Sequence, residues 1–133
     1  MLKWIVVFLV TFIIFMVVDV MWLGLFAKKF YRKHLGFIMS DKFNLPVAAA
    51  FYFVFIIGLL FFVVSPAIKD QSFVHALFGG MLFGLITYGT YDLTNMATLK
   101  NWPKLITIVD LIWGSSLCGV VSMVSYLLFK TYI

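Results

Sequence analysis

The sequence predicts an all-α integral membrane protein, a bundle of four transmembrane helices. Hydrophobic residues make up 65% of the 133 residues and charged residues only 11%, whereas soluble domains average about 45–50% apolar and about 25% charged residues. A soluble domain of this size leaves too much surface in water to hide so many apolar side chains. The apolar residues form four long blocks without strict alternation, which excludes membrane β-strands and fits helices of about 20 residues.

The first predicted span covers residues 4–26. Its apolar run is longer than the core of a secretory signal, and Lys28 and Lys29 end it as a stop-transfer sequence would. We therefore expect a retained helix. In the loop that follows, apolar residues fall roughly on one helical face and basic residues around the rest. This pattern fits a short interfacial helix on anionic lipid, and a simple linker fits it as well.

The other three predicted spans cover residues 46–65, 73–99 and 103–129, and prolines mark their boundaries. Pro46 and Pro103 suit the first turn of a helix, where the missing N–H group costs nothing. Together the four spans predict a single transmembrane domain over the whole chain.

Other residues predict where the spans begin and end and how the helices pack. Asn44 and Asn101 are candidate N-caps of the second and fourth spans, and Pro66 is expected to stop the second. Small residues four apart, as in glycophorin-type contacts, predict close helix packing in the third and fourth spans. These residues are Gly80 and Gly84, and Ser115 and Gly119.

The distribution of basic residues predicts the orientation. Of the ten lysines and arginines, only Lys3, Lys69 and Lys130 lie outside the first and third loops. Because positive charge marks cytoplasmic loops, these two loops are expected in the cytoplasm and both termini outside. The residues that carry this prediction are Lys28, Lys29, Arg32, Lys33, Lys42, Lys100 and Lys104.

Three aspartates lie inside the predicted spans: Asp19, Asp92 and Asp110. A carboxylate at mid-bilayer costs about 2.5–3.5 kcal/mol on insertion scales, so something must offset it. Each aspartate is six to nine residues from a lysine of a predicted cytoplasmic loop, a depth of roughly 9–14 Å at about 1.5 Å per residue. The three carboxyl groups should therefore share one cytoplasm-facing layer.

The neighbours of these aspartates define a candidate pocket. An Asp-x-x-Trp pattern occurs twice and places carboxylate and indole on one helical face. Asp92 has the densest polar surroundings, and we expect it to be the functionally dominant residue; Tyr52 is the only polar residue of the second span at this level. The predicted pocket residues are Asp19, Trp22, Tyr88, Tyr91, Asp92, Asn95, Asp110 and Trp113.

The sequence contains little evidence for a metal site or a disulfide. His34 and His75 belong to opposite faces of the membrane, so they cannot share a metal, and no metal or cofactor is expected. The single cysteine, Cys118, excludes a disulfide within the chain. A structural alternative is a cage in which Arg32 or a lysine reaches down to pair with the aspartates.

Several segments resemble domain-of-unknown-function family 2177, a set of small predicted bacterial inner-membrane proteins. The resemblance is carried by the segments 19–24 (Asp-Val-Met-Trp-Leu-Gly), 30–31 (Phe-Tyr), 90–103 (Thr-Tyr-Asp-Leu-Thr-Asn-Met-Ala-Thr-Leu-Lys-Asn-Trp-Pro) and 110–114 (Asp-Leu-Ile-Trp-Gly). It covers nearly the whole chain and implies a four-helix protein of the bacterial inner membrane. It implies no particular activity.

Three functions are compatible with such a layer. The first is a binding or transport protein for a small cationic or lipid-like molecule, since aromatic faces and carboxylates attract cations. The second is a metal-independent enzyme that acts on a lipid through acid and base aspartates. The third is an accessory or assembly protein whose polar layer fixes helix register. Membrane lipids are the expected partners, transport would need a homo-oligomer, and no nucleic-acid partner is expected.

Overall fold

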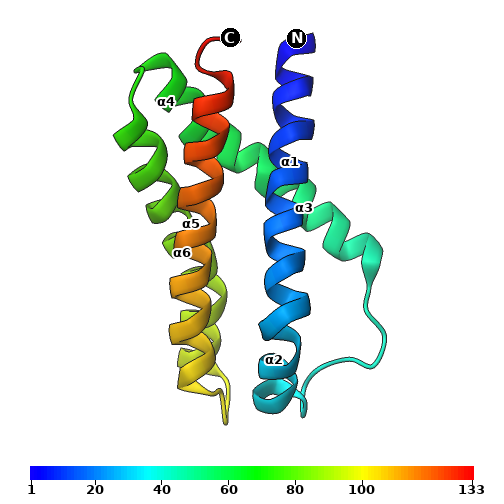
Figure 1. Ribbon diagram of the computed structural model, residues 1–133. Helices are drawn as coiled ribbons and strands as arrows, with labels where there is room; N and C mark the ends of the chain where they lie inside the picture. The colour runs from blue at the N-terminus through cyan, green and yellow to red at the C-terminus, as the bar shows by residue number, and fades with distance from the viewer.

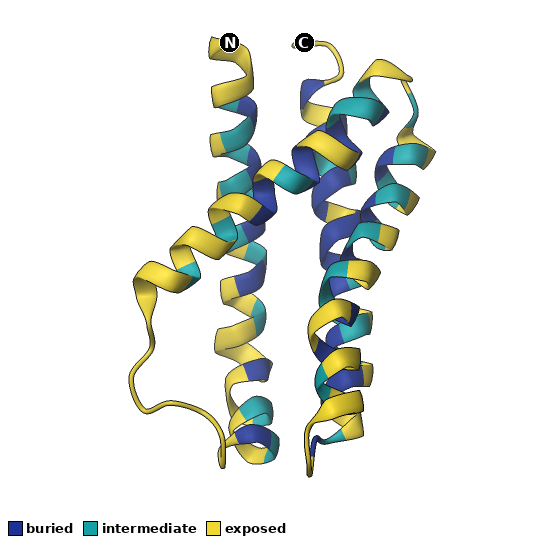
Figure 2. Cartoon of the chain, turned by 180° about the vertical axis from the view of Figure 1, so that it is seen from behind, coloured by how far each residue is buried: buried dark blue, intermediate teal, exposed yellow.

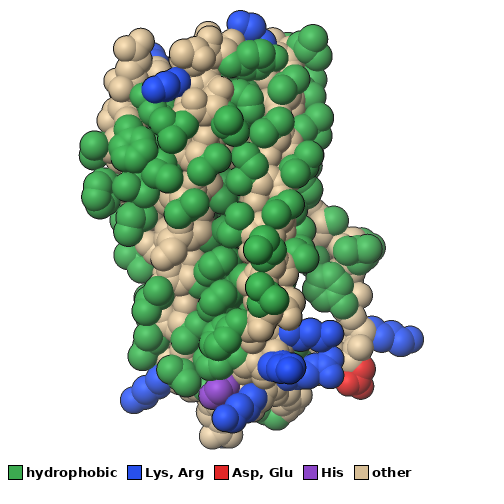
Figure 3. All heavy atoms as spheres, in the orientation of Figure 1, with side chains coloured by type: hydrophobic (Ala, Val, Ile, Leu, Met, Phe, Trp, Pro, Cys, Tyr) green, Lys and Arg blue, Asp and Glu red, His purple; other side chains and the backbone are tan.

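The computed structural model describes residues 1–133 as an all-α protein with four long helices and no strand. Each helix is long and apolar enough to cross a membrane, which confirms the predicted fold class. Figure 1 shows both termini at one end of the bundle. On the face that Figure 3 shows, apolar side chains cover much of the bundle between its ends, and Lys and Arg side chains lie near the two ends.

The first long helix is continuous from Leu2 to Leu35. It consists of α1 (Leu2–Trp22), the π-helical segment η1 (Leu23–Ala27) and α2 (Lys28–Leu35). The Lys28 N–H group bonds the Leu23 carbonyl five residues back, which is the wide turn of a π-helix. A short helix thus occupies the first loop, which is one of the two alternatives that the sequence left open, but it continues the first span instead of forming a separate element. Its contact with a lipid surface stays a prediction.

The second long helix joins α3 (Leu45–Leu59), the π-helical segment η2 (Leu60–Val64) and α4 (Ser65–Lys69). The predicted cap is confirmed: Asn44 Oδ1 accepts a hydrogen bond from the backbone N–H of Val47 (3.2 Å).

The prediction that Pro66 stops this helix is wrong, because the helix continues to Lys69. The backbone N–H of Ser65 bonds the Leu60 carbonyl five residues back. This wide π turn lets the helix pass a residue that has no N–H group to donate.

The last two long helices are α5 (Phe73–Thr98) and α6 (Lys104–Phe129). The prediction that Asn101 caps α6 is wrong: α6 begins after Pro103 without a side-chain cap. Asn101 instead has a φ of 61° in the turn between the two helices. This left-handed conformation is one that asparagine tolerates better than most residues.

Helices α5 and α6 pack through direct backbone contact. A Cβ atom added to Gly84 would lie 2.1 Å from the carbonyl oxygen of Gly114, and one added to Gly80 would lie 2.5 Å from that of Cys118. Ser115 Oγ donates to the carbonyl of Met81 on the facing helix (3.0 Å). The predicted packing role of the small residues is therefore confirmed.

Helix α6 is the most buried of the four (Figure 2). It is tied to α1 by a buried hydrogen bond between the hydroxyls of Thr11 and Ser125 (3.0 Å). Helix α3 crosses α1 at an angle, and both ribbon views show its N-terminal half apart from α5 and α6 (Figures 1 and 2). Side chains of all four long helices face the region between this half of α3 and the other helices.

We expect Gly84→Ala to destabilise the protein, because its Cβ would force α5 and α6 apart at a backbone contact. Overpacking of this kind costs about 1–3 kcal/mol. Gly24→Ala is the matched control, since nothing lies within 4 Å of a Cβ there. Thermal unfolding in detergent should show a lower Tm for Gly84→Ala alone. Equal Tm values for both variants would contradict the packing described here.

Candidate functional site

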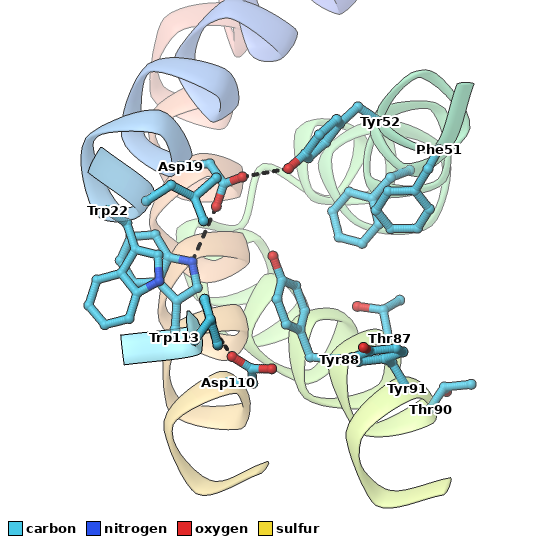
Figure 4. Close-up of a pocket in the computed structure, with 13 residues that line it drawn as sticks. Asp19, Trp22, Phe51, Tyr52, Thr87, Tyr88, Thr90, Tyr91, Asp110 and Trp113 are labelled. Atoms are coloured by element: carbon cyan, nitrogen blue, oxygen red, sulfur yellow. Dashed lines mark hydrogen bonds between the residues drawn. The ribbon is translucent and has the colours of Figure 1, made fainter. Parts of the chain in front are cut away.

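A cavity of about 560 Å³ lies among all four long helices. Its volume is within the range of about 300–1,000 Å³ typical of small-molecule sites. Figure 4 shows side chains from facing helices that point into it. The lining residues are Asp19, Trp22, Leu23, Tyr31, Phe51, Tyr52, Phe55, Thr87, Tyr88, Thr90, Tyr91, Asp110 and Trp113.

Asp19 is held at the wall of the cavity by donors from two other helices. Tyr52 of α3 donates a hydrogen bond from Oη to Asp19 Oδ2 (2.8 Å), and Trp113 of α6 donates from Nε1 to Oδ1 (3.4 Å) (Figure 4). Asp19 is only 5% exposed. Both oxygens thus have a neutral donor, and neither has a cation.

Asp110 is held in the same way by the first long helix. The hydroxyl of Tyr31, in α2, donates a hydrogen bond to Asp110 Oδ1, and Asp110 is buried. The continuation of α1 through η1 into α2 is what carries Tyr31 to α6. The π-helical segment η1 is therefore part of the architecture of the site.

Asp92 lies behind Asp110 and is fully buried. No group donates a hydrogen bond to either of its carboxyl oxygens. The carboxyl group of Asp110 lies close by, three residues along α6 from the Thr107 hydroxyl that donates to the Asp92 carbonyl. Because two carboxylates can only accept, this contact becomes a hydrogen bond only when one of them carries a proton.

A short polar chain fixes the backbone beside Asp92. Trp102 Nε1 donates to Thr107 Oγ1 (2.9 Å), and this hydroxyl donates to the carbonyl oxygen of Asp92 (3.4 Å). The chain joins the end of α5 to the start of α6, but it leaves the Asp92 side chain without a donor.

No basic residue compensates the three intramembrane aspartates. The only ion pair in the structure joins His75 Nδ1 and Asp70 Oδ2 (3.1 Å), between α5 and the turn before it. The structural alternative, in which Arg32 or a lysine pairs with the buried carboxylates, is therefore not what the structure contains. The cavity keeps its acidic character without an internal counter-ion.

Aromatic rings form much of the remaining wall. Trp22 and Trp113 stack with ring centroids 4.3 Å apart and an interplanar angle of 9°. Tyr88 projects into the centre of the cavity (Figure 4), and its ring packs where a Cβ on Gly114 would lie, only 2.2 Å from Cγ. Phe55 meets the Tyr88 ring edge-on at 6.4 Å.

The hydroxyl groups of the wall are largely occupied. Thr87 Oγ1 donates to the carbonyl of Phe83 (2.8 Å), and Thr90 Oγ1 donates to that of Ile86 (2.7 Å). Together with the tyrosine donors already bonded to carboxylates, this leaves negative charge, aromatic faces and the hydroxyl groups of Tyr88 and Tyr91 as the features that a ligand would meet.

The structure brings most of the predicted pocket residues together. All of them line the cavity except Asp92, which lies behind Asp110, and Asn95. Asn95 is half-buried on α5, and its side chain makes no hydrogen bond within the protein. The residues that line the cavity as predicted are Asp19, Trp22, Tyr88, Tyr91, Asp110 and Trp113.

The pocket prediction omitted Tyr31, which lies in a segment predicted as loop. Depth was the signal that could have found it, because Tyr31 is only three residues beyond Lys28. Tyr52 was noted at the right level but not placed in the pocket. Phe51, Phe55 and the two threonines carry no chemical pattern that distinguishes them from ordinary span residues.

Comparison with known proteins adds the family. The family described as "Predicted membrane protein (DUF2177)" matches residues 4–127, which include all the aspartates and aromatic residues of the cavity. Neither the curated proteins nor the solved structures contain a match. The match spans nearly the whole chain and agrees with the four apolar helices. The chain belongs to the DUF2177 family of predicted membrane proteins.

Proposed function

We propose that the protein binds a small organic cation, one with an apolar portion, in the cavity between its four long helices. The observation that carries this proposal is that Asp19 and Asp110 line an aromatic cavity while no lysine or arginine pairs with either. A bound cation would supply the missing positive charge. Aromatic faces add to its binding, since a desolvated cation–π contact is worth about 2 kcal/mol.

The lining of the cavity favours an organic cation over a metal ion. A metal ion prefers a shell of several oxygen ligands, but the wall here is mostly aromatic, and its Tyr52 and threonine hydroxyls are already bonded. A quaternary ammonium group needs no hydrogen-bond acceptor and gains from rings and carboxylates alone. Benzyltrimethylammonium is therefore a suitable probe.

The two carboxylates should control the affinity for this probe. Two unit charges about 6 Å apart interact by about 3 kcal/mol at an effective dielectric of about 20. Asp19→Asn and Asp110→Asn should each weaken benzyltrimethylammonium binding by up to about a hundredfold, as measured by calorimetry in detergent. Asp41→Asn is the control, because Asp41 is exposed in the first loop.

A neutral analogue completes this test. Neopentylbenzene has the same shape, with carbon in place of nitrogen, and should bind weakly to all variants. The proposal fails if wild-type protein binds neither compound, or if it binds both equally and the aspartate variants change nothing.

We also propose that the first and third loops face the cytoplasm of a bacterial inner membrane and that both termini lie outside. The structure supports this orientation, because α2 and the α5–α6 turn lie at the end of the bundle away from the termini (Figure 1). Most basic residues belong to this end. The carboxylates of the cavity would then lie nearer the cytoplasmic surface.

Thiol labelling tests the orientation in a Cys118→Ser background. Cysteines at Lys33 and Asn101 should resist an impermeant thiol reagent in intact cells, whereas a cysteine at Thr131, which is exposed near the C-terminus, should be labelled. The physical reason is the charge asymmetry between the two sides. Labelling at Lys33 and Asn101, with protection at Thr131, would invert the orientation.

An enzyme that acts on a lipid is a second candidate, favoured by the contact between Asp92 and Asp110 beside Tyr31. Two carboxyl groups in one site can serve as acid and base. Turnover of a membrane lipid by the purified protein would support this candidate. Saturable binding of the cation without turnover would support the first. Transport would further require a homo-oligomer, since four helices leave little room for alternating access.

A further inference from the structure

The pair formed by Asp92 and Asp110 points beyond cation binding. Asp92 is 0% exposed, has no hydrogen-bond donor for either carboxyl oxygen, and lies close to Asp110, because Thr107 holds this part of α5 against α6. Asp110, in turn, lines the cavity. One member of the pair can thus contact a ligand, and the other is closed off from it.

The elements packed around the pair bring no positive charge that could stabilise two carboxylates. The titratable groups that face it are Tyr31 of α2, which donates to Asp110, and Tyr91 of α5. Thr107 of α6 reaches only the backbone carbonyl of Asp92. No lysine, arginine or histidine pairs with either carboxyl group.

Two neighbouring carboxylates repel each other and only accept hydrogen bonds. A single shared proton removes the repulsion and converts the contact into a hydrogen bond from a carboxyl to a carboxylate, which is among the stronger kinds. In the empty cavity, the proton is the only positive charge available to the pair.

We propose that Asp92 and Asp110 share one proton in the empty protein and release it when a cation binds, so that the cavity exchanges a proton for its ligand. This inference rests on the proposed function. When the cation reaches Asp110, the O–H bond of the shared proton breaks, the proton passes to water, and both carboxylates remain. The pair with its proton and the pair with its cation carry the same net charge, so the exchange leaves the charge of the site unchanged.

Calorimetry measures the exchange directly. Benzyltrimethylammonium is titrated into the full-length protein in two buffers that differ in their enthalpy of protonation but share one pH. About one proton should be released per bound cation, and the affinity should rise by up to about tenfold per pH unit where the pair holds its proton. In Asp92→Asn, the amide donates to Asp110 in place of the proton, so neither proton release nor pH dependence should remain. Asp41→Asn is expected to behave as wild type.

An infrared difference spectrum of wild-type protein makes the test independent of any variant's folding. The C=O band of a protonated carboxyl group should disappear when the cation is added. Binding without proton release and without this spectral change would overturn the exchange and leave the proposed function intact. Proton release that persists in Asp92→Asn would also overturn it. Absence of cation binding in wild type would overturn both proposals.

Discussion

Inside a bilayer, a carboxyl group that loses its water must be compensated by something else, and this protein has three such groups without a basic partner. This need for compensation explains the hydrogen bonds that Asp19 and Asp110 receive. Tyr52 and Trp113 donate to Asp19, and Tyr31 donates to Asp110. These donors come from three different helical segments, so the polar contacts also hold α1, α2, α3 and α6 around one cavity. Neutral donors reduce the cost of burial but leave the charge uncancelled.

The contact between α5 and α6 sets the frame for this cavity. Glycines at the contact let the two backbones touch, and Gly114 also makes room for the ring of Tyr88. The same close approach places Asp92 on α5 beside Asp110 on α6. Packing and chemistry are therefore linked: residues that bring the helices together also bring the two carboxyl groups within reach of each other.

The sequence was sufficient for the class of fold and for six of the thirteen residues that line the cavity. The lengths of the apolar blocks predict four helices, and the depth of each aspartate relative to a loop lysine predicts a common layer. Helical periodicity adds Trp22 and Trp113, because a spacing of three residues keeps a side chain on the same face. These predictions require only the length, rise and periodicity of a regular α-helix.

What the sequence could not predict depends on departures from regular helices and on packing. The π-helical segments η1 and η2 carry the chain past Ala27 and Pro66, where the composition predicts an end. Without η1, Tyr31 is predicted to lie in a loop rather than beside Asp110. Nor does the sequence distinguish Asp92, which is closed off, from Asp110, which lines the cavity, because both share the same depth and differ only in the helix face that packs inward.

The proposed site for an organic cation consists of the uncompensated carboxylates and the aromatic rings around them. A crystal structure with 4-iodobenzyltrimethylammonium tests it most directly, because anomalous scattering locates the iodine independently of the protein. We expect an iodine peak in the cavity, with the ammonium group against the ring of Tyr88 and between Asp19 and Asp110. A cavity that holds no ligand at saturating concentration, or one in which a lysine pairs with these carboxylates, would contradict it.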